Sequence, residues 1–249
     1  MDLALHGRRA LVTGASSGLG LGCARALAAE GATVTLVARS ADKLAAAAAT
    51  FPSGAIVHTI AADVSDSEAV VEMMARAEAA MGGVDILIAN AGGPPPGTFA
   101  TTPLDAYLPA LQLNLLSTVS MCTAAVPAMR SRGWGRVVAI TSTTAREPSP
   151  NLILSNTARA GLTAYLKTLS REVAVDGVTV NSLQPGLHRT DRLVAIYGDT
   201  SQLAAEVPTG TIGEADDFGR IAAFLCSDAA KFVNGVAIPV DGGASHGIQ

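Results

Sequence analysis

The sequence has little cysteine, few aromatic residues and little charge. Among 249 residues there are three cysteines, and aromatic and charged residues make up 4% and 15% of the chain. Cys23, Cys122 and Cys226 are odd in number and far apart, so they predict neither a disulfide framework nor a metal site. We expect each of them to be a buried small apolar residue. The four histidines have no metal-ligand spacing either, so no metal is expected.

Net charge and long apolar runs are also limited. The formal net charge is −4, which gives no electrostatic reason to expect a nucleic-acid partner. Residues 1–7 lack a basic start followed by an apolar run, so we expect no secretory signal. No stretch reaches the apolar length needed to span a bilayer, so we expect no membrane partner and a cytoplasmic protein.

What the chain does contain is a regular alternation of apolar strand patterns and helical patterns. Hydrophobic residues make up 49% of the sequence, which suits a sheet covered on both faces. The alternation predicts one α/β domain over residues 1–249, with a doubly wound parallel sheet of about seven strands and helices on both faces. Expected strands are 9–13, 33–38, 55–61, 84–89, 136–141, 178–183 and 236–240. Expected helices are 19–29, 41–50, 151–175 and 214–227, with a long helical region entered at Thr102-Pro103.

Two local signals refine this organisation. Ser65 and Glu68 have the spacing of a capping box that opens a helix. Trp134 lies between two glycines just before the fifth strand, where we expect its ring to anchor a turn.

A glycine-rich turn lies between the first strand and the first helix. Gly14, Gly18 and Gly20 permit a tight turn and let backbone N–H groups approach a pyrophosphate. The helix that follows directs the positive end of its dipole toward the same point. Its place at the start of a βαβ unit predicts a Rossmann-type dinucleotide site.

The glycine spacing resembles the fingerprint of the short-chain dehydrogenase/reductase family, and other landmarks of that family follow in order. These are Asp63-Val64, Asn90-Ala91-Gly92, Asn114, Ser142, Asn181, Pro185-Gly186, Thr190 and Asp241-Gly242-Gly243. The chain looks similar to 3-oxoacyl carrier-protein reductases. The resemblance implies a homo-oligomer, a tetramer or a dimer. It implies cofactor contacts from Gly14, Ser16, Ser17, Gly18, Leu19, Gly20, Arg39, Asp63, Val64, Asn90, Ala91, Gly92, Arg159, Pro185, Gly186 and Thr190.

The end of the second strand bears on the choice of cofactor. An acidic residue there would accept hydrogen bonds from the adenosine ribose and repel a 2′-phosphate. This chain has Ala38 and Arg39 instead, with no carboxylate before Asp42. Arg39 can pair with a 2′-phosphate, which favours NADP(H) over NAD(H). The alternative is that Arg39 is only a solvated surface residue.

The resemblance fails at the usual catalytic pair. The family uses Ser, Tyr and Lys, with Tyr and Lys four residues apart. Alignment from Ser142 and from Asn181 places Ser155 at the Tyr position and Arg159 at the Lys position. The candidate catalytic residues are therefore Ser142, Asn114, Ser155 and Arg159. An aliphatic hydroxyl is a much weaker acid than a phenol, so Ser155 does not replace the missing proton donor.

Several explanations stay open. In the first, the protein is a working reductase in which a water held by Ser155, Ser142 and Asn114 relays the proton. In the second, His188 or Tyr197, from the segment after Pro185, donates the proton. In a third reading the chain binds the nucleotide with little or no turnover and acts as a sensor or partner subunit. A dehalogenase-like reaction is weaker, because relatives of that kind have lost the glycine-rich loop.

Residues 187–210 form the expected substrate lid. This segment contains Leu193, Val194, Ile196, Tyr197 and Leu203 with few charges, which favours a small-molecule substrate that is apolar or acyl in part. Arg146-Glu147 lines the substrate mouth or is a solvated loop feature.

Overall fold

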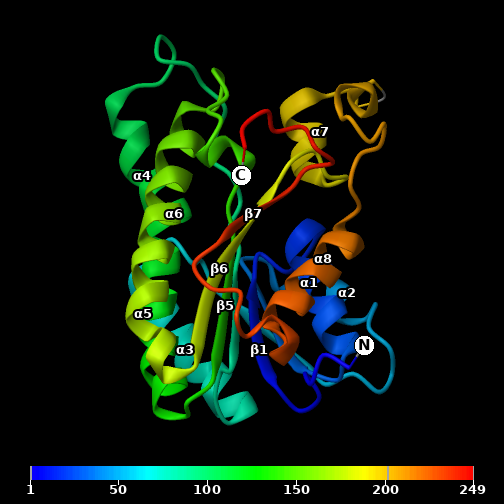
Figure 1. The fold of residues 1–249 in the computed structure, drawn as a ribbon, viewed down its shortest axis with the longest axis vertical. Coiled ribbons are helices and arrows are strands. Elements are labelled where there is room, and N and C mark those ends of the chain that lie inside the picture. Colours follow the sequence, from blue (N-terminus) through cyan, green and yellow to red (C-terminus); the bar gives the residue numbers. More distant parts are fainter. Residues whose placement is uncertain (1, 201, 249) are drawn as a thin grey trace.

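The computed structural model describes residues 2–200 and 202–248 and is built around one sheet of seven parallel strands (Figure 1). The strand order is β3-β2-β1-β4-β5-β6-β7. The strands are β1 (Arg9–Thr13), β2 (Thr33–Ala38), β3 (Val57–Ala61), β4 (Ile86–Ala89), β5 (Gly135–Ile140), β6 (Val178–Pro185) and β7 (Ala237–Val240). The predicted doubly wound sheet is confirmed, and the predicted bounds of β1 and β2 are those of the structure.

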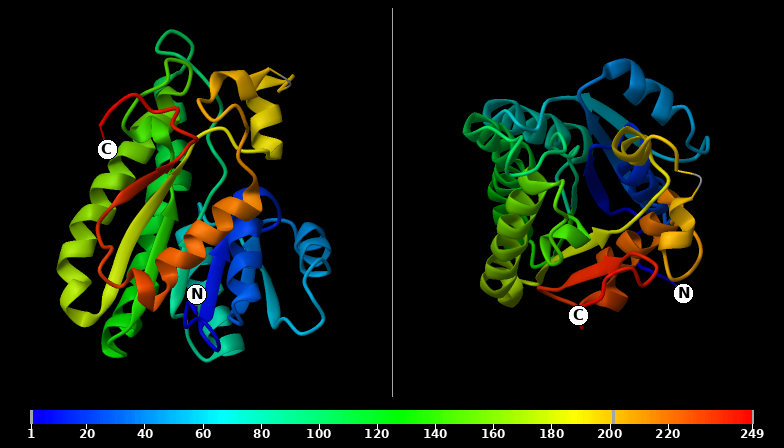
Figure 2. Two further views of the ribbon diagram at one scale, coloured as in Figure 1. Left: turned by 45° about the vertical axis from the view of Figure 1, so that its right-hand side comes forward. Right: turned by 90° about the horizontal axis from the view of Figure 1, so that it is seen from above.

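Helices cover both faces of the sheet (Figures 1 and 2). One layer contains α1 (Gly18–Ala29), α2 (Ala41–Ala48) and α8 (Ala215–Cys226), whose apolar side chains share a core with Val12 and Leu36. The other contains α3 (Ser67–Met81), α5 (Ser117–Ser131) and α6 (Ile153–Val173), packed on Leu87 and Val137. The short helices α4 (Tyr107–Leu111) and α7 (Asp191–Tyr197) flank the carboxyl ends of the strands.

Two predicted helix starts are wrong. Asp66, not Ser65, caps α3, and its carboxylate accepts from the N–H groups of Glu68 and Ala69. Ser65 instead donates its N–H and its hydroxyl to Asp63. Pro103 precedes a short 3₁₀ turn and is not its first residue, because the turn begins at Leu104.

One helical run is more apolar than the sequence analysis expected. Leu104–Ser131 is long and apolar enough to cross a membrane by length and composition alone, and 44% of its most apolar window is buried. The expectation that no stretch reaches that length is therefore wrong for this segment. Met121, Met129 and Cys122 of the same run are buried in the core beside the sheet. Part of the run is therefore packed against the sheet.

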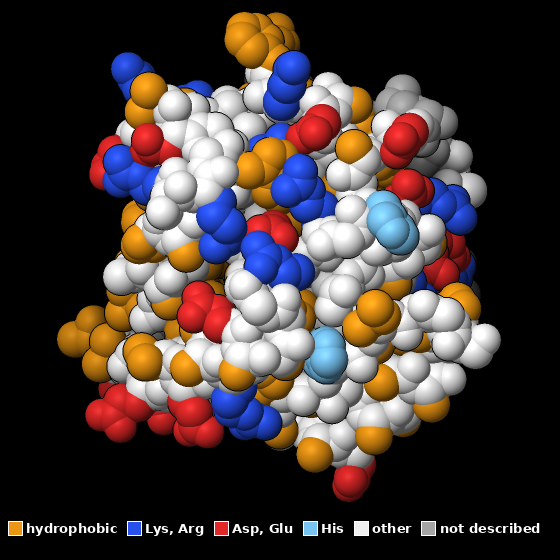
Figure 3. Space-filling model, turned by 90° about the horizontal axis from the view of Figure 1, so that it is seen from below, with side chains coloured by type: hydrophobic (Ala, Val, Ile, Leu, Met, Phe, Trp, Pro, Cys, Tyr) orange, Lys and Arg blue, Asp and Glu red, His pale blue; other side chains and the backbone are white. Residues whose placement is uncertain are grey.

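The face at the amino ends of the strands carries basic and acidic side chains close together (Figure 3). Asp85 pairs with Arg9 at 2.6 Å and with Arg132 at 3.3 Å. Burial opposes ionisation of Asp85, but the hydrogen bonds and charge of Arg9 hold its pKa below the ordinary value. Trp134 lies under the guanidinium groups of Arg8 and Arg136, 3.7 Å and 4.3 Å from its ring centre.

The Trp134 indole also donates to Asp228, which confirms its anchoring role. The three cysteines are buried and free, as predicted. Burial raises the pKa values of Cys122 and Cys226 to about 12, so both are thiols at neutral pH.

Candidate nucleotide and substrate site

A cavity of about 900 Å³ opens at the carboxyl ends of the strands. It spans the boundary between β1 and β4, where the strand order reverses. Ligands of doubly wound sheets bind at this switch point, because the loops on either side of it diverge and leave a crevice.

The structure brings nearly all of the predicted site residues together around this cavity. Gly14, Ser16, Ser17, Gly18, Leu19, Arg39, Asp63, Val64, Asn90, Ala91, Gly92, Ser142, Ser155, Arg159, Pro185, Gly186 and Thr190 line it. Gly20 and Asn114 lie behind the wall and not on it.

The glycine-rich loop is shaped by positions where a side chain does not fit. Gly14 and Gly18 have φ values of +59° and +55°, in the left-handed region that glycine adopts without strain. A Cβ on Gly20 would lie 2.3 Å from the Gly14 carbonyl oxygen, so the first turn of α1 can approach the loop only as glycine. A Cβ on Gly18 would lie 3.2 Å from the methyl group of Thr190 across the cavity.

The amino end of α1 is open toward the cavity. Ser17 is its N-cap, but the Ser17 side chain makes no capping hydrogen bond. The first N–H groups of a helix have no partner within it, so here they remain available to an anion. Asn90 holds the loop in place: its N–H donates to the Thr13 hydroxyl and its amide nitrogen to the Gly14 carbonyl, at 2.9 Å and 3.3 Å.

Two cations lie beyond the end of β2. Arg39 and Lys43 both line the cavity and both are exposed. The nearest carboxylate on the wall is Asp63, which accepts from the N–H and hydroxyl of Ser65. These hydrogen bonds and, less strongly, the charge of Arg39 lower the pKa of Asp63.

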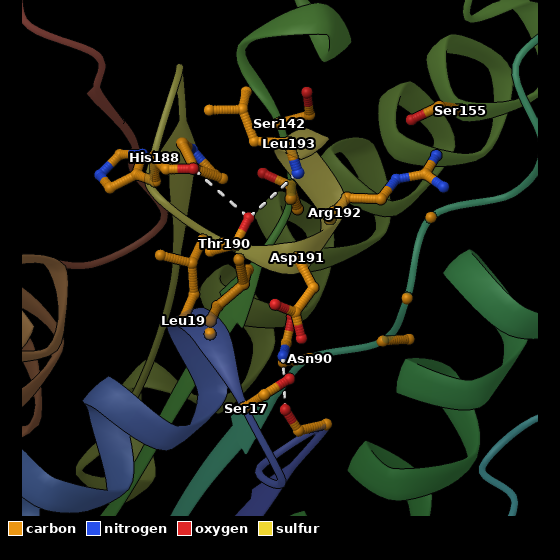
Figure 4. A pocket seen from close by; sticks show the side chains of 18 of the residues that line it. Ser17, Leu19, Asn90, Ser142, Ser155, His188, Thr190, Asp191, Arg192 and Leu193 are labelled. Atoms are coloured by element: carbon orange, nitrogen blue, oxygen red, sulfur yellow. Dashed lines mark hydrogen bonds between the residues drawn. The ribbon is translucent and has the colours of Figure 1, made fainter. Parts of the chain in front are cut away.

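Ser142 and Ser155 lie near the other end of the cavity (Figure 4). Ser142 lies two residues after the end of β5, and its hydroxyl lies 2.9 Å from that of Thr144 and accepts from the Thr144 N–H at 3.1 Å. Ser155 lies in the first turn of α6. Arg159 is one helical turn further along α6, so both side chains reach the same wall.

Arg159 is buried, with 6% of its surface exposed. Its guanidinium donates to the carbonyls of Ile140, at 2.6 Å, and Ala91, at 3.2 Å. No ion pair joins it to a carboxylate of residues 2–200 or 202–248. Burial, assisted by the charge of Arg192, lowers the pKa of Arg159 to about 10, and the group stays cationic at neutral pH.

Asn114 sits in a local distortion of the helix. Residues Gln112–Leu116 form a π-helical turn, and such turns are frequent at functional sites. The Asn114 side chain is buried, and neither its oxygen nor its nitrogen has a partner in the described part of the chain. An unpaired buried amide is costly, so this side chain has hydrogen bonds to offer to a group within the site.

The segment after Pro185 forms the remaining wall. The Thr190 hydroxyl caps α7 by accepting from the Leu193 N–H. Leu193 and Leu203 bury against Ile212 in a small cluster of their own. Part of the apolar surface expected to face a substrate is therefore used to fold this segment.

His188 does not suit the role of a loop proton donor. Its ring is buried against Phe218, with the two centres 5.1 Å apart, and it points away from Ser155 (Figure 4). Burial lowers its pKa, so the ring is neutral near pH 7. Glu147, expected at the substrate mouth or as a solvated loop residue, accepts hydrogen bonds from the N–H groups of His246 and Gly247.

Sequence reasoning missed seven charged or polar residues of the wall, which are Ser40, Lys43, Thr141, Thr143, Thr144, Asp191 and Arg192. Lys43 could have been found from its place four residues after Arg39, in the first turn of α2. Arg192 follows Thr190 by two residues, but its direction depends on how α7 packs.

A family model described as enoyl-(acyl carrier protein) reductase matches residues 14–245. The chain is 34% identical to the 3-oxoacyl-(acyl-carrier-protein) reductase FabG of Escherichia coli strain K12, over 96% of this chain and 97% of that protein. It belongs to the short-chain dehydrogenase/reductase family. Members of this family are oxidoreductases that bind a nicotinamide cofactor and act on small molecules.

Solved structures of this short-chain dehydrogenase/reductase family share the whole fold. L-sorbose reductase from Gluconobacter frateurii, complexed with NADPH and L-sorbose, is 31% identical with a TM-score of 0.94, and each chain is fully covered. YwfH, an NADPH-dependent reductase involved in bacilysin biosynthesis, is 27% identical with a TM-score of 0.93, over 97% of this chain and 99% of that one.

Proposed function

We propose that this protein is an NADP(H)-dependent oxidoreductase that acts on a carbonyl or alcohol substrate with a proton donor other than tyrosine. The observation that carries the proposal is the pair of exposed cations, Arg39 and Lys43, on the cavity wall beyond β2. Ala38 and Arg39 stand at the end of β2, where an acidic residue would bind a ribose diol, and a guanidinium pairs well with phosphate. The NADPH complex of the sorbose reductase and the NADPH dependence of YwfH support the same choice.

The residues present fit the cofactor. Gly20 lets the first turn of α1 lie close to the glycine-rich loop, and the amino end of α1 has no side-chain cap. Together they form a cradle for a pyrophosphate. In this proposal Asp63 and Val64 contact the adenine, and Arg159 holds the nicotinamide ribose. The nicotinamide end would be enclosed by six further residues of the wall, which are Asn90, Ala91, Gly92, Pro185, Gly186 and Thr190. When bound, the nicotinamide supplies or receives a hydride.

The proposed source of the proton differs from the tyrosine that is usual in the family. In this proposal Ser155 stands at the position of the usual tyrosine and Arg159 at that of the usual lysine. Ser142 polarises the substrate oxygen, and Ser155 and Ser142 hold a water that protonates it. The unpaired amide of buried Asn114 supports a water chain behind α6.

A second candidate is a nucleotide-binding protein with little or no turnover. The same residues would bind the cofactor, and the loss of the tyrosine would then mark the loss of catalysis. The retention of Ser142 on the cavity wall beside Ser155 favours the oxidoreductase. The oligomeric state and the cytoplasmic location expected from the family are part of the proposal, as is the role of residues 187–210 as a lid.

Calorimetry with NADPH and NADH, on the protein and on Arg39→Ala, tests the cofactor site. We expect NADPH to bind at least tenfold tighter than NADH, and Arg39→Ala to remove most of this preference while leaving NADH binding within about twofold. Arg171→Ala, an exposed arginine on α6, is the matched control. Equal affinity for both cofactors would reject the NADP(H) assignment. Absence of binding to either would reject the oxidoreductase.

A further inference from the structure

Two guanidinium groups converge on the substrate end of the cavity. Arg159 reaches the wall from α6 and Arg192 from α7, and each is partly or wholly withdrawn from water. Arg159 donates only to backbone carbonyls, and Arg192 donates to the Pro94 carbonyl at 2.6 Å. Among residues 2–200 and 202–248, neither forms an ion pair with a carboxylate.

The acidic side chains on the wall do not offset these charges. The wall contains two carboxylates, Asp63 and Asp191, among the described residues. Asp63 lies beyond β3 and is engaged by Ser65. Asp191 points toward Asn90, away from the guanidinium of its neighbour Arg192 (Figure 4). The substrate end therefore has an excess of positive charge.

The position of Arg192 is built into the fold. The next residue, Leu193, is buried in the cluster with Leu203 and Ile212, which fixes α7. On the other side, a Cβ on Gly93 would lie 2.8 Å from an Arg192 nitrogen, so the loop after β4 admits the guanidinium because residue 93 is glycine. The side chain is thus held between two elements and does not trail into solvent.

Its direction separates it from the site of the pyrophosphate. Arg192 extends toward the side of the cavity where α6 carries Ser155, and away from Ser17 and Leu19 of the glycine-rich loop (Figure 4). Like charges brought together away from water repel unless an anion lies between or beside them. The charge of Arg192 indeed contributes to the lowered pKa of Arg159. Arg192 therefore points away from the part of the cavity at α1 where a cofactor phosphate would bind.

We propose that Arg192 binds the carboxylate of an acidic substrate, so that the protein acts on oxo acids or hydroxy acids in preference to neutral carbonyl compounds. A guanidinium suits this role because its planar donors match the two oxygens of a carboxylate. The small side chain of Ser155 leaves room for the carbon chain between Arg192 and Ser142. This inference rests on the proposed oxidoreductase function and deepens it.

The test uses the protein saturated with NADP⁺, so that the phosphate sites are filled. Calorimetry compares straight-chain carboxylates from acetate to octanoate with the neutral amides of the same chain length. We expect at least one acid of the series to bind at least tenfold tighter than its amide at pH 7. Arg192→Gln should reduce that ratio below about twofold and leave the NADPH dissociation constant within twofold of the parent value.

Arg189→Gln is the matched control, because Arg189 lies three residues away, is exposed and pairs with Glu214 at 2.9 Å. It should keep the preference for the acid. If no acid of the series is preferred over its amide, or if the preference survives in Arg192→Gln, the inference is wrong. Loss of NADPH binding by the parent protein would instead reject the proposed function, so the two failures are distinguishable.

Discussion

The guanidinium of Arg159 is tied to the end of β5 by a 2.6 Å hydrogen bond to the carbonyl of Ile140. A second bond, to Ala91, connects the same side chain to the loop after β4. One side chain thus joins α6 to two neighbouring strand ends. It thereby connects the helix that carries Ser155 to the strand end that precedes Ser142.

Arg159→Lys should lower stability although it restores the residue usual in the family. A single ammonium cannot maintain both carbonyl bonds in the geometry of the planar guanidinium, and one lost bond costs about 1 kcal/mol. For a chain of this size we expect the melting temperature to fall by roughly 2–4 °C. Differential scanning calorimetry of Arg159→Lys and of the exposed control Arg171→Lys measures this. An unchanged melting temperature would show that the two bonds contribute little.

Ser155→Tyr combined with Arg159→Lys should increase NADPH-dependent reduction of simple ketones. A positioned phenol restores general acid catalysis, which contributes about 10²-fold or more. Ser155→Phe with Arg159→Lys is the matched control, because it fills the same space without a hydroxyl. Steady-state rates with both double variants decide the matter. Equal rates would mean that filling the space, and not proton donation, causes any change.

Two glycines should respond to alanine in opposite directions. A Cβ on Gly22 would lie 2.1 Å from the Ala215 carbonyl oxygen at the contact of α1 with α8, so Gly22→Ala should destabilise the fold by about 3 kcal/mol. Gly161 is exposed on α6, and a Cβ there would meet Leu115 at an ordinary 3.5 Å. Gly161→Ala should stabilise by about 0.5–1 kcal/mol. Urea unfolding gives both values, and a common sign would contradict the packing argument.

Stability should decline as the pH falls below about 6.5, in part because of His188. Burial depresses its folded pKa, although the Gly186 carbonyl and the charges of Glu214 and Asp241 partly offset the effect. The unfolded chain therefore takes up a proton first, and stability present above the unfolded pKa is lost as pH falls through it.

The His188→Asn variant isolates this contribution. It should be less stable than the parent at pH 7.5, because the contact with Phe218 is lost. The difference in melting temperature should narrow between pH 7 and pH 5. A gap that stays constant over this range would show that His188 does not titrate in the folded protein with a lowered pKa.

The fold was predictable because its signals are local and repeated. The β-branched run of β2 and the glycine-rich turn before α1 each predict their own structure, and the parallel sheet follows from their alternation. Helix starts were less predictable, because Ser65 and Asp66 are both residue types that cap helices well. Asp66 caps α3 in the structure, while the Ser65 hydroxyl donates to Asp63.

The candidate site was predictable where a motif fixes the backbone, as at Gly14 and Asn90, and less so where tertiary packing decides. The π-helical turn at Asn114 has no sequence signal in this chain. Leu193 lines the cavity as the sequence suggests, but Leu203 is buried with Ile212 because of how the segment folds back. The same folding gives Arg192 its direction.

Pro239 lies in β7, the last strand of the sheet. The ladder to β6 uses the carbonyls of Val236 and Val240, which accept from Ser182 and Gly186. Since successive residues of a strand alternate in direction, the nitrogen of Pro239 faces the outer side, where it has no hydrogen to donate. Another copy of the chain therefore cannot extend the sheet here with a complete ladder, and self-association through this edge toward fibres is suppressed.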